Sequence, residues 1–350
     1  MPSDSNPLLR FACWAPLAVA AAMPAISWAA PSALFAGEAP LAIRIEAPFQ
    51  TVLRQRDDPE YQPGRVAAAG TQGDVAVDVR VRVRGKSRVK ACDFPPLLLN
   101  FPKDQPDGSP FAGENRLKLV THCSSSASFD QYNALERQVY RVLNLLTESS
   151  LRIRPVNVTY FDSGRGRELV AKAGFLIEDE ERFAERSGLT PVSVPRVEAA
   201  SYDPAALALL DTFEYFIGNT DWSSAEGPAG SSCCHNVVPF VRPDGVHVPV
   251  PYDFDASGIV NAPYALPDAR LPISTVRQRL FRGRCREMTA FDAPFARFKE
   301  QRAAIEALFS TDAGLSDKAS KGAREYIAAF YETIGDPKKA ERAFRVACPR

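Results

Sequence analysis

The chain has 350 residues, with 42 basic and 42 acidic side chains and a formal net charge of zero. Hydrophobic residues make up 45% of the sequence and charged residues 24%, which is the composition of an ordinary globular protein. These values argue against a nucleic-acid-binding protein, which would be basic, and against a disordered chain.

The N-terminal segment is typical of a signal peptide. An apolar run over residues 11–25 is followed by Ser27-Trp28-Ala29, whose small residues suit cleavage. An uncleaved anchor is the alternative, but Pro16 and Pro24 interrupt the run, and it is shorter than the roughly 20 residues of a spanning helix. We therefore expect residues 1–29 to be removed, leaving a secreted or periplasmic protein without a stable membrane anchor.

Loss of the leader removes Cys13 and leaves an even set of cysteines in an oxidising compartment, so disulfides are expected among Cys92, Cys123, Cys233, Cys234, Cys285 and Cys348. Six cysteines allow 15 connectivities. Cys92 and Cys123 flank two apolar strand candidates and would suit a cross-strand bridge. A zinc site is the alternative, but Cys233-Cys234-His235 lacks the C-x-x-C spacing and the chain has only 3 histidines, His122, His235 and His247.

The first half of the chain is rich in strand patterns. Apolar residues alternate in period two over residues 41–49 and 74–84. Shorter apolar runs and one amphipathic helix follow, which predicts strands at 96–101, 116–122, 156–161 and 168–177 and a helix at 129–146.

The second half is predominantly helical. A strongly apolar helix is expected at 204–217, followed by a Gly-, Ser- and Cys-rich loop, two short strands and a Pro-rich stretch, and then by helices at about 291–309, 316–334 and 337–345. The division predicts a signal peptide at 1–29, a strand-rich part at 40–178 and a helical part at 179–350. No internal repeat is visible.

Three polar residues stand out in apolar surroundings between residues 213 and 262. The helix 204–217 leads to Asp221, a loop returns to Asn236, and a strand leads to Asp253. Two carboxylates and an amide oxygen are hard ligands that suit Mg²⁺. In kinase-type phosphoryl transfer one Asp orients the attacking hydroxyl, while an Asn and a second Asp hold the metal. Each motif alone also fits a turn or a strand end.

These motifs resemble those of the CotH family, the atypical secreted or spore-coat protein kinases. The resemblance covers roughly residues 74–263 and is carried by Ile217-Gly218-Asn219-Thr220-Asp221-Trp222-Ser223, His235-Asn236 and Pro251-Tyr252-Asp253-Phe254-Asp255, and more weakly by Val81-Arg82-Val83-Arg84-Gly85 and Gly174-Phe175-Leu176-Ile177-Glu178. It implies an α+β, two-lobed protein-kinase-like fold with a strand-rich N-lobe and a helical C-lobe, using Mg²⁺ (or Mn²⁺) and ATP.

By this resemblance Asp221 is the catalytic aspartate, Asn236 and Asp253 are the metal ligands, and Asp255 is a candidate for an additional ligand. One departure matters, because an insertion bearing Cys233 and Cys234 separates Asp221 from Asn236. The inserted loop must fold back, and a disulfide from either cysteine could hold it.

The strand-rich half offers residues for the nucleotide. Lys118 on a strand and Glu136 on the following helix match the lysine–glutamate pair that positions phosphates in kinases, with Arg84 and Lys103 as competitors for the phosphate contact. Ile177, Glu178 and Asp179 lie where the hinge between lobes would meet the adenine, although acidic runs are usually solvated. No glycine-rich phosphate loop occurs.

The sequence therefore predicts an exported kinase acting on a protein or small-molecule acceptor, although ATP is scarce outside the cytoplasm. A catalytically silent, kinase-like binding or scaffold protein of the cell envelope and a secreted metal-dependent hydrolase are the alternatives. A basic cluster at residues 277–286 is a local patch, which could dock an acidic substrate, pair with carboxylates near the site, or lie solvated. The sequence leaves the oligomeric state open.

Overall fold

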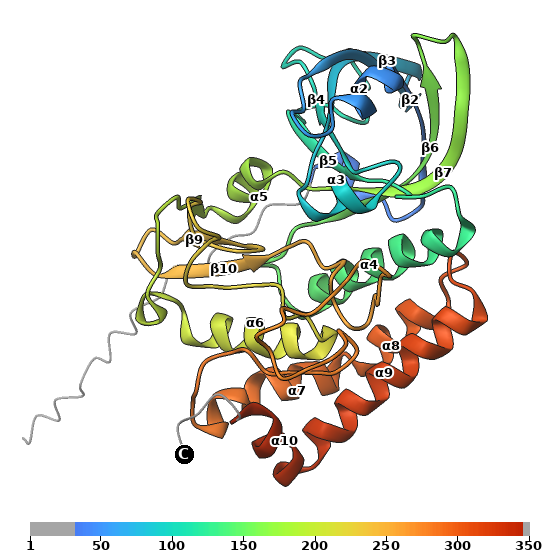
Figure 1. Ribbon diagram of the computed structural model, residues 1–350. Helices are drawn as coiled ribbons and strands as arrows, with labels where there is room; N and C mark the ends of the chain where they lie inside the picture. The colour runs from blue at the N-terminus through green and yellow to red at the C-terminus, as the bar shows by residue number, and fades with distance from the viewer. Residues whose placement is uncertain (1–31, 346–350) are drawn as a thin grey trace, which may run out of the picture.

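The computed structural model of the protein describes residues 32–345, so the predicted signal peptide and Cys348 lie outside the described residues. A β-barrel stands beside a helical region, and the long helix α4 (Ala127–Leu146) lies between them (Figure 1). The barrel strands are β1 (Leu41–Ala47), β2 (Gln62–Gly70), β3 (Gly73–Val83), β4 (Leu97–Asn100), β5 (Arg116–Val120), β6 (Ile153–Asp162) and β7 (Arg167–Ile177). Three short helices, α1 (Ala33–Ala36), α2 (Phe49–Arg54) and α3 (Ser87–Ala91), accompany the barrel.

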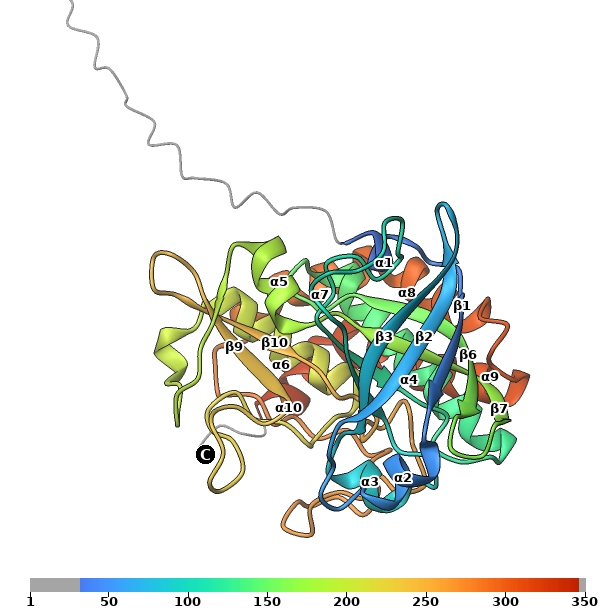
Figure 2. The ribbon, with the colours of Figure 1, turned by 90° about the horizontal axis from the view of Figure 1, so that it is seen from above.

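The seven strands form a closed barrel in the order β1-β2-β3-β4-β5-β7-β6. Neighbouring strands are antiparallel except at the closure, where β1 and β6 run parallel from Leu41↔Val156 to Ala47↔Asp162. Figure 2 shows β1, β2 and β3 side by side along one wall. The mixed α+β composition is as expected, but the predicted two-lobed kinase-like fold is wrong, because the parallel β1–β6 pairing closes the strand-rich part into a barrel.

The barrel interior is filled with aliphatic side chains. Along β3 every second residue is buried, from Val75 to Val83, which confirms the period-two prediction. The same core includes residues from all the other strands, among them Ile45, Leu99 and Leu117. The inward-facing side chains therefore form the hydrophobic core of the barrel, and contacts with other elements are made by the ends and the outer face of the barrel.

The helical region has its own core. Its helices are α5 (Glu180–Ser187), α6 (Pro204–Ile217), α7 (Asp292–Glu300), α8 (Arg302–Ser310), α9 (Asp317–Gly335) and α10 (Pro337–Phe344), with short 3₁₀ turns η1 (Ala199–Ser201) and η2 (Met288–Phe291). The helix expected at 291–309 is divided into α7 and α8 at Gln301. Helix α4 packs its buried face into this core, although it comes from the first half of the chain.

A small sheet in the order β10-β9-β8 completes the fold, with β8 (Thr190–Pro191), β9 (Val237–Val241) and β10 (His247–Pro251). Cys92 and Cys123 are joined with an S–S distance of 2.09 Å, as their flanking positions suggested, and Cys233 is bonded to its neighbour Cys234. The Cys233–Cys234 bond leaves neither thiolate free for zinc. Among residues 32–345, no helix combines the length and the apolar character needed to cross a membrane.

His122 gives the barrel a pH-dependent stability. Its ring is buried against Phe94 and Tyr160, and burial lowers its pKa to about 4. The unfolded chain takes up the proton near pH 6.5, so this contribution to stability is present above that pH. It is lost as the pH falls toward 4, by about 3 kcal/mol in total.

We predict that His122→Phe removes this loss. Between pH 7 and pH 4 the wild type should lose about 3 kcal/mol of unfolding free energy that the variant does not lose. Urea unfolding of both proteins at the two pH values measures this difference. A difference between the two proteins that does not change with pH would contradict the assignment.

Candidate active site in the pocket beside the β9–β10 hairpin

The β9–β10 hairpin places Asn236 beside Asp253. Val237 pairs with Pro251 at the end of the antiparallel ladder, so the residues just outside it, Asn236 and Tyr252, are neighbours. The backbone N–H of Tyr252 donates to the Asn236 carbonyl at 3.0 Å. Antiparallel pairing thus makes Asn236 and Tyr252, which are 16 residues apart in the sequence, direct neighbours, and Asp253 follows Tyr252.

Gly218 ends α6 and turns the chain toward Asp221. It adopts a φ of +69°, and its N–H bonds back to the carbonyls of Glu214 and Tyr215. A Cβ at this position would lie 2.0 Å from the Tyr326 hydroxyl. A side chain here would therefore displace the turn that leads to Asp221.

The Asp221 carboxylate is held by two residues of the returning loop. His235 Nε2 lies 2.7 Å from Asp221 Oδ1, and Asn236 Nδ2 donates to the Asp221 carbonyl at 2.7 Å and to Oδ2 at 3.3 Å. The hydrogen bond to the Asp221 carboxylate raises the pKa of His235, because the imidazolium donates to a carboxylate more strongly than the neutral ring. The inserted loop therefore does fold back, and it brings Asp221 and Asn236 together.

Asn236 and Asp253 both have a backbone that non-glycine residues seldom adopt. Their φ angles are +53° and +65°, in the left-handed region. Asn and Asp tolerate this region better than most residues, and such strain gathers at functional sites. The Asp253 N–H is held by the Tyr140 hydroxyl of α4 at 2.9 Å, which fixes the turn.

A buried arginine, Arg88 of α3, joins the site to the barrel. Its guanidinium bonds both Glu136 carboxylate oxygens at 3.0 Å, Asp253 Oδ1 at 2.5 Å, and lies 3.0 Å from Asp255 Oδ2 through Nε. The contact between Arg88 and Asp255 is an ion pair, and Asp255 Oδ2 accepts no hydrogen bond from the described residues. We did not predict Arg88 from the sequence, because a single arginine in an unpredicted five-residue helix carries no local signal.

The three carboxylates around Arg88 differ in their electrostatics. Burial raises the pKa of Glu136 and of Asp255, and Arg88 offsets only part of this rise. Burial acts in the same direction on Asp253, but Arg88 and then Arg84 outweigh it and hold the pKa of Asp253 below its ordinary value. Asp253 is thus the carboxylate best kept ionised, and its side chain is 31% exposed.

A pocket of about 740 Å³ is lined by Asp221, Asn236 and Asp253, a size suited to a small-molecule ligand. Arg84 and Lys86, from the turn after β3, line its barrel side. Neither cation forms an ion pair with any residue in the described range 32–345. The pocket therefore combines acidic and amide oxygens with two cations available to an anionic ligand.

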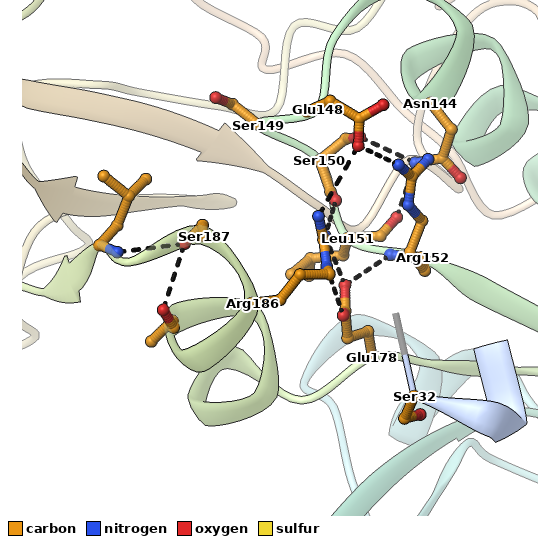
Figure 3. A network of polar contacts seen from close by, with 12 residues as sticks. Ser32, Asn144, Glu148, Ser149, Ser150, Leu151, Arg152, Glu178, Arg186 and Ser187 are labelled. Carbon is orange, nitrogen blue, oxygen red and sulfur yellow. Dashed lines mark hydrogen bonds and ion pairs between the residues drawn. The ribbon is translucent and has the colours of Figure 1, made fainter. Parts of the chain in front are cut away.

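The other residues expected to bind the nucleotide have different partners. Lys118 binds Glu180 at 2.6 Å and lies over the Tyr252 ring, so the expected Lys118–Glu136 pair is not formed. Figure 3 shows Glu178 bonded to Arg186 and to the backbone of Arg152.

The backbone of the expected hinge is also engaged. Ile177 pairs with Lys118 and Ile153 in the barrel, and the Asp179 side chain caps α5 through the N–H of Glu181. Ile177, Glu178 and Asp179 do not line the pocket, whereas Glu180 does. Lys103 does not line it either.

The donor set fits a hard divalent cation. Glu136, Asp253 and Asp255 each offer a carboxylate oxygen, and these oxygens lie within 4.8 Å of one another. Oxygen ligands of this kind suit Mg²⁺ or Mn²⁺ rather than zinc. Arg88 already contacts all three carboxylates, and of these residues only Asp253 lines the pocket, which Asn236 also lines.

No family model matches the chain, and no curated protein matches it significantly. The site is therefore interpreted from its own geometry.

We predict that removing Arg88 is strongly destabilising. Arg88→Met leaves the buried carboxylates of Glu136 and Asp255 without their cation, and breaking a buried ion pair from one side costs about 3–5 kcal/mol. Adding Glu136→Gln should recover part of the loss, which a double-mutant cycle of urea unfolding would measure.

Arg65→Met is the control for this cycle, because the Arg65–Asp78 pair is exposed on the barrel surface and should contribute little. An Arg88→Met protein as stable as Arg65→Met would show that the cluster does not need its arginine.

Proposed function

We propose that the protein is a divalent-cation-dependent phosphotransferase that moves a phosphoryl group from ATP to a hydroxyl of a protein or small-molecule acceptor. The observation that carries the proposal is the single pocket in which Asp221, Asn236 and Asp253 face Arg84 and Lys86. Motif resemblance to the CotH kinases supports the same chemistry. The proposal concerns the site and does not depend on a kinase-like fold.

In this proposal Asp221 is the catalytic residue. His235 and Asn236 fix its carboxylate, which accepts the proton of the acceptor hydroxyl as the new O–P bond forms and the bond to the leaving diphosphate breaks. Arg84 and Lys86 bind the phosphates. Asn236 and Asp253 would hold Mg²⁺ or Mn²⁺, which supplies charge neutralisation for the transferring group.

We predict that Asp221→Asn abolishes transfer without unfolding the protein. The Asp221 side chain is 57% exposed, so its amide analogue should fold, while the loss of the proton acceptor lowers the rate by about 100-fold or more. The assay follows labelled ATP in Mg²⁺ or Mn²⁺ with a panel of hydroxyl acceptors. The nucleotide product, ADP or AMP, tells phosphoryl from adenylyl transfer.

Asp253→Asn tests the cation site in the same assay and should lose transfer as well as Mn²⁺ binding. Asp268→Asn is the matched control, because Asp268 pairs with Arg270 on the surface and does not line the pocket. Wild-type transfer by Asp221→Asn would refute the proposal. Thermal stabilisation of the wild type by ATP without turnover would instead identify a binding protein.

A further inference from the structure

The basic cluster at residues 277–286 binds the elements that carry the site, chiefly helix α6. Arg279 donates to the carbonyls of Tyr215 and Phe216 at the end of α6 and to Tyr326 of α9, and Arg286 binds Asp211 of α6 at 2.6 Å. Arg277 donates to the Gly258 carbonyl. The N–H groups of these three arginines donate to backbone carbonyls and to Asp211. This disfavours a role for the basic cluster in docking an acidic substrate, and it disfavours a fully solvated cluster.

The loop that carries Asp221 has no regular secondary structure, so its backbone groups need other partners. Arg282 Nη1 donates to the Thr220 carbonyl and, at 3.4 Å, to the Trp222 carbonyl. The carbonyl between them, that of Asp221, accepts from Asn236. The Asp221 N–H donates to the Asn219 side chain at 2.9 Å.

We infer that Arg282 is a positioning residue for Asp221. By holding the carbonyls on both sides of the aspartate, its guanidinium fixes the peptide planes from which the Asp221 side chain projects. The carboxylate is then directed toward His235 and the pocket. Arg282 touches neither the carboxylate nor the pocket lining, so it acts through the loop backbone alone.

Arg282 differs from its neighbour Arg279 in what its loss would do. Arg279 is mostly buried and bonds three carbonyls of two helices, so its removal affects the packing of α6 on α9. Arg282 is exposed and forms no ion pair with the described residues, but Thr220 and Trp222, whose carbonyls it binds, are buried, so its removal takes the donor away from two carbonyls beside Asp221. Its effect is therefore expected first on the geometry of the Asp221 loop, whereas that of Arg279 is expected on the packing of two helices.

Two readouts test the inference, and only the kinetic one rests on the proposed function. Arg282→Ala should remain folded but shift or broaden the imidazole resonances of His235 in ¹H–¹⁵N spectra, because His235 binds the Asp221 carboxylate and so reports its position. In the transfer assay kcat should fall roughly 10- to 100-fold while KM for ATP changes less than about twofold. Arg282→Lys, which keeps one donor, should restore part of both.

Arg284→Ala is the matched control, since its side chain makes no hydrogen bond to the loop over residues 218–223. If the wild type is active and Arg282→Ala has an unchanged kcat, the inference is overturned, whatever the spectrum shows. If the wild type transfers no phosphate, the proposed function fails and the spectrum alone decides. His235 resonances that match the wild type would then overturn the inference, and a shift absent from Arg284→Ala would support it.

Discussion

The position of the site depends on the buried guanidinium of Arg88. It joins α3 of the barrel, Glu136 of α4 and the Asp253–Asp255 segment that follows β10, three segments separated by up to 167 residues. Apolar packing is not directional, whereas a guanidinium donates its N–H groups to carboxylates only in set directions. The ion network therefore fixes how the barrel sits against the segment that carries Asp253.

The Cys92–Cys123 disulfide supports this arrangement. Cys92 follows α3 directly, and Cys123 lies just beyond β5, so the bond ties the short helix of Arg88 to the barrel. A five-residue helix has little stability of its own. The covalent link and the three carboxylates that Arg88 binds together hold it in place.

The sequence predicted the elements whose signals are local. The alternation in β3, the amphipathic helix α4 and the apolar helix α6 were all visible in the sequence. The order Asp221, Asn236, Asp253 identified residues that share one pocket. Closure of the barrel was not predictable, because a parallel β1–β6 pair joins strands more than a hundred residues apart and leaves no turn signature between them. Lys118 and Glu136 had the right spacing for a pair, but Glu180 and Arg88 lie closer to them in the fold.

The inserted loop between Asp221 and Asn236 is held by packing and backbone hydrogen bonds, because its disulfide joins only the neighbours Cys233 and Cys234. The sequence suggested that a disulfide would draw Asn236 back to Asp221, yet Cys233 and Cys234 are bonded to each other. The loop returns because Ser223 and His235 exchange two backbone hydrogen bonds and Cys233 donates its N–H to Val194. Trp222 and Cys233 are buried in the same apolar cluster, which closes the base of the loop. Asn236 thus reaches Asp221 through the burial of the residues beside each of them, and its place in the site does not require a distant disulfide.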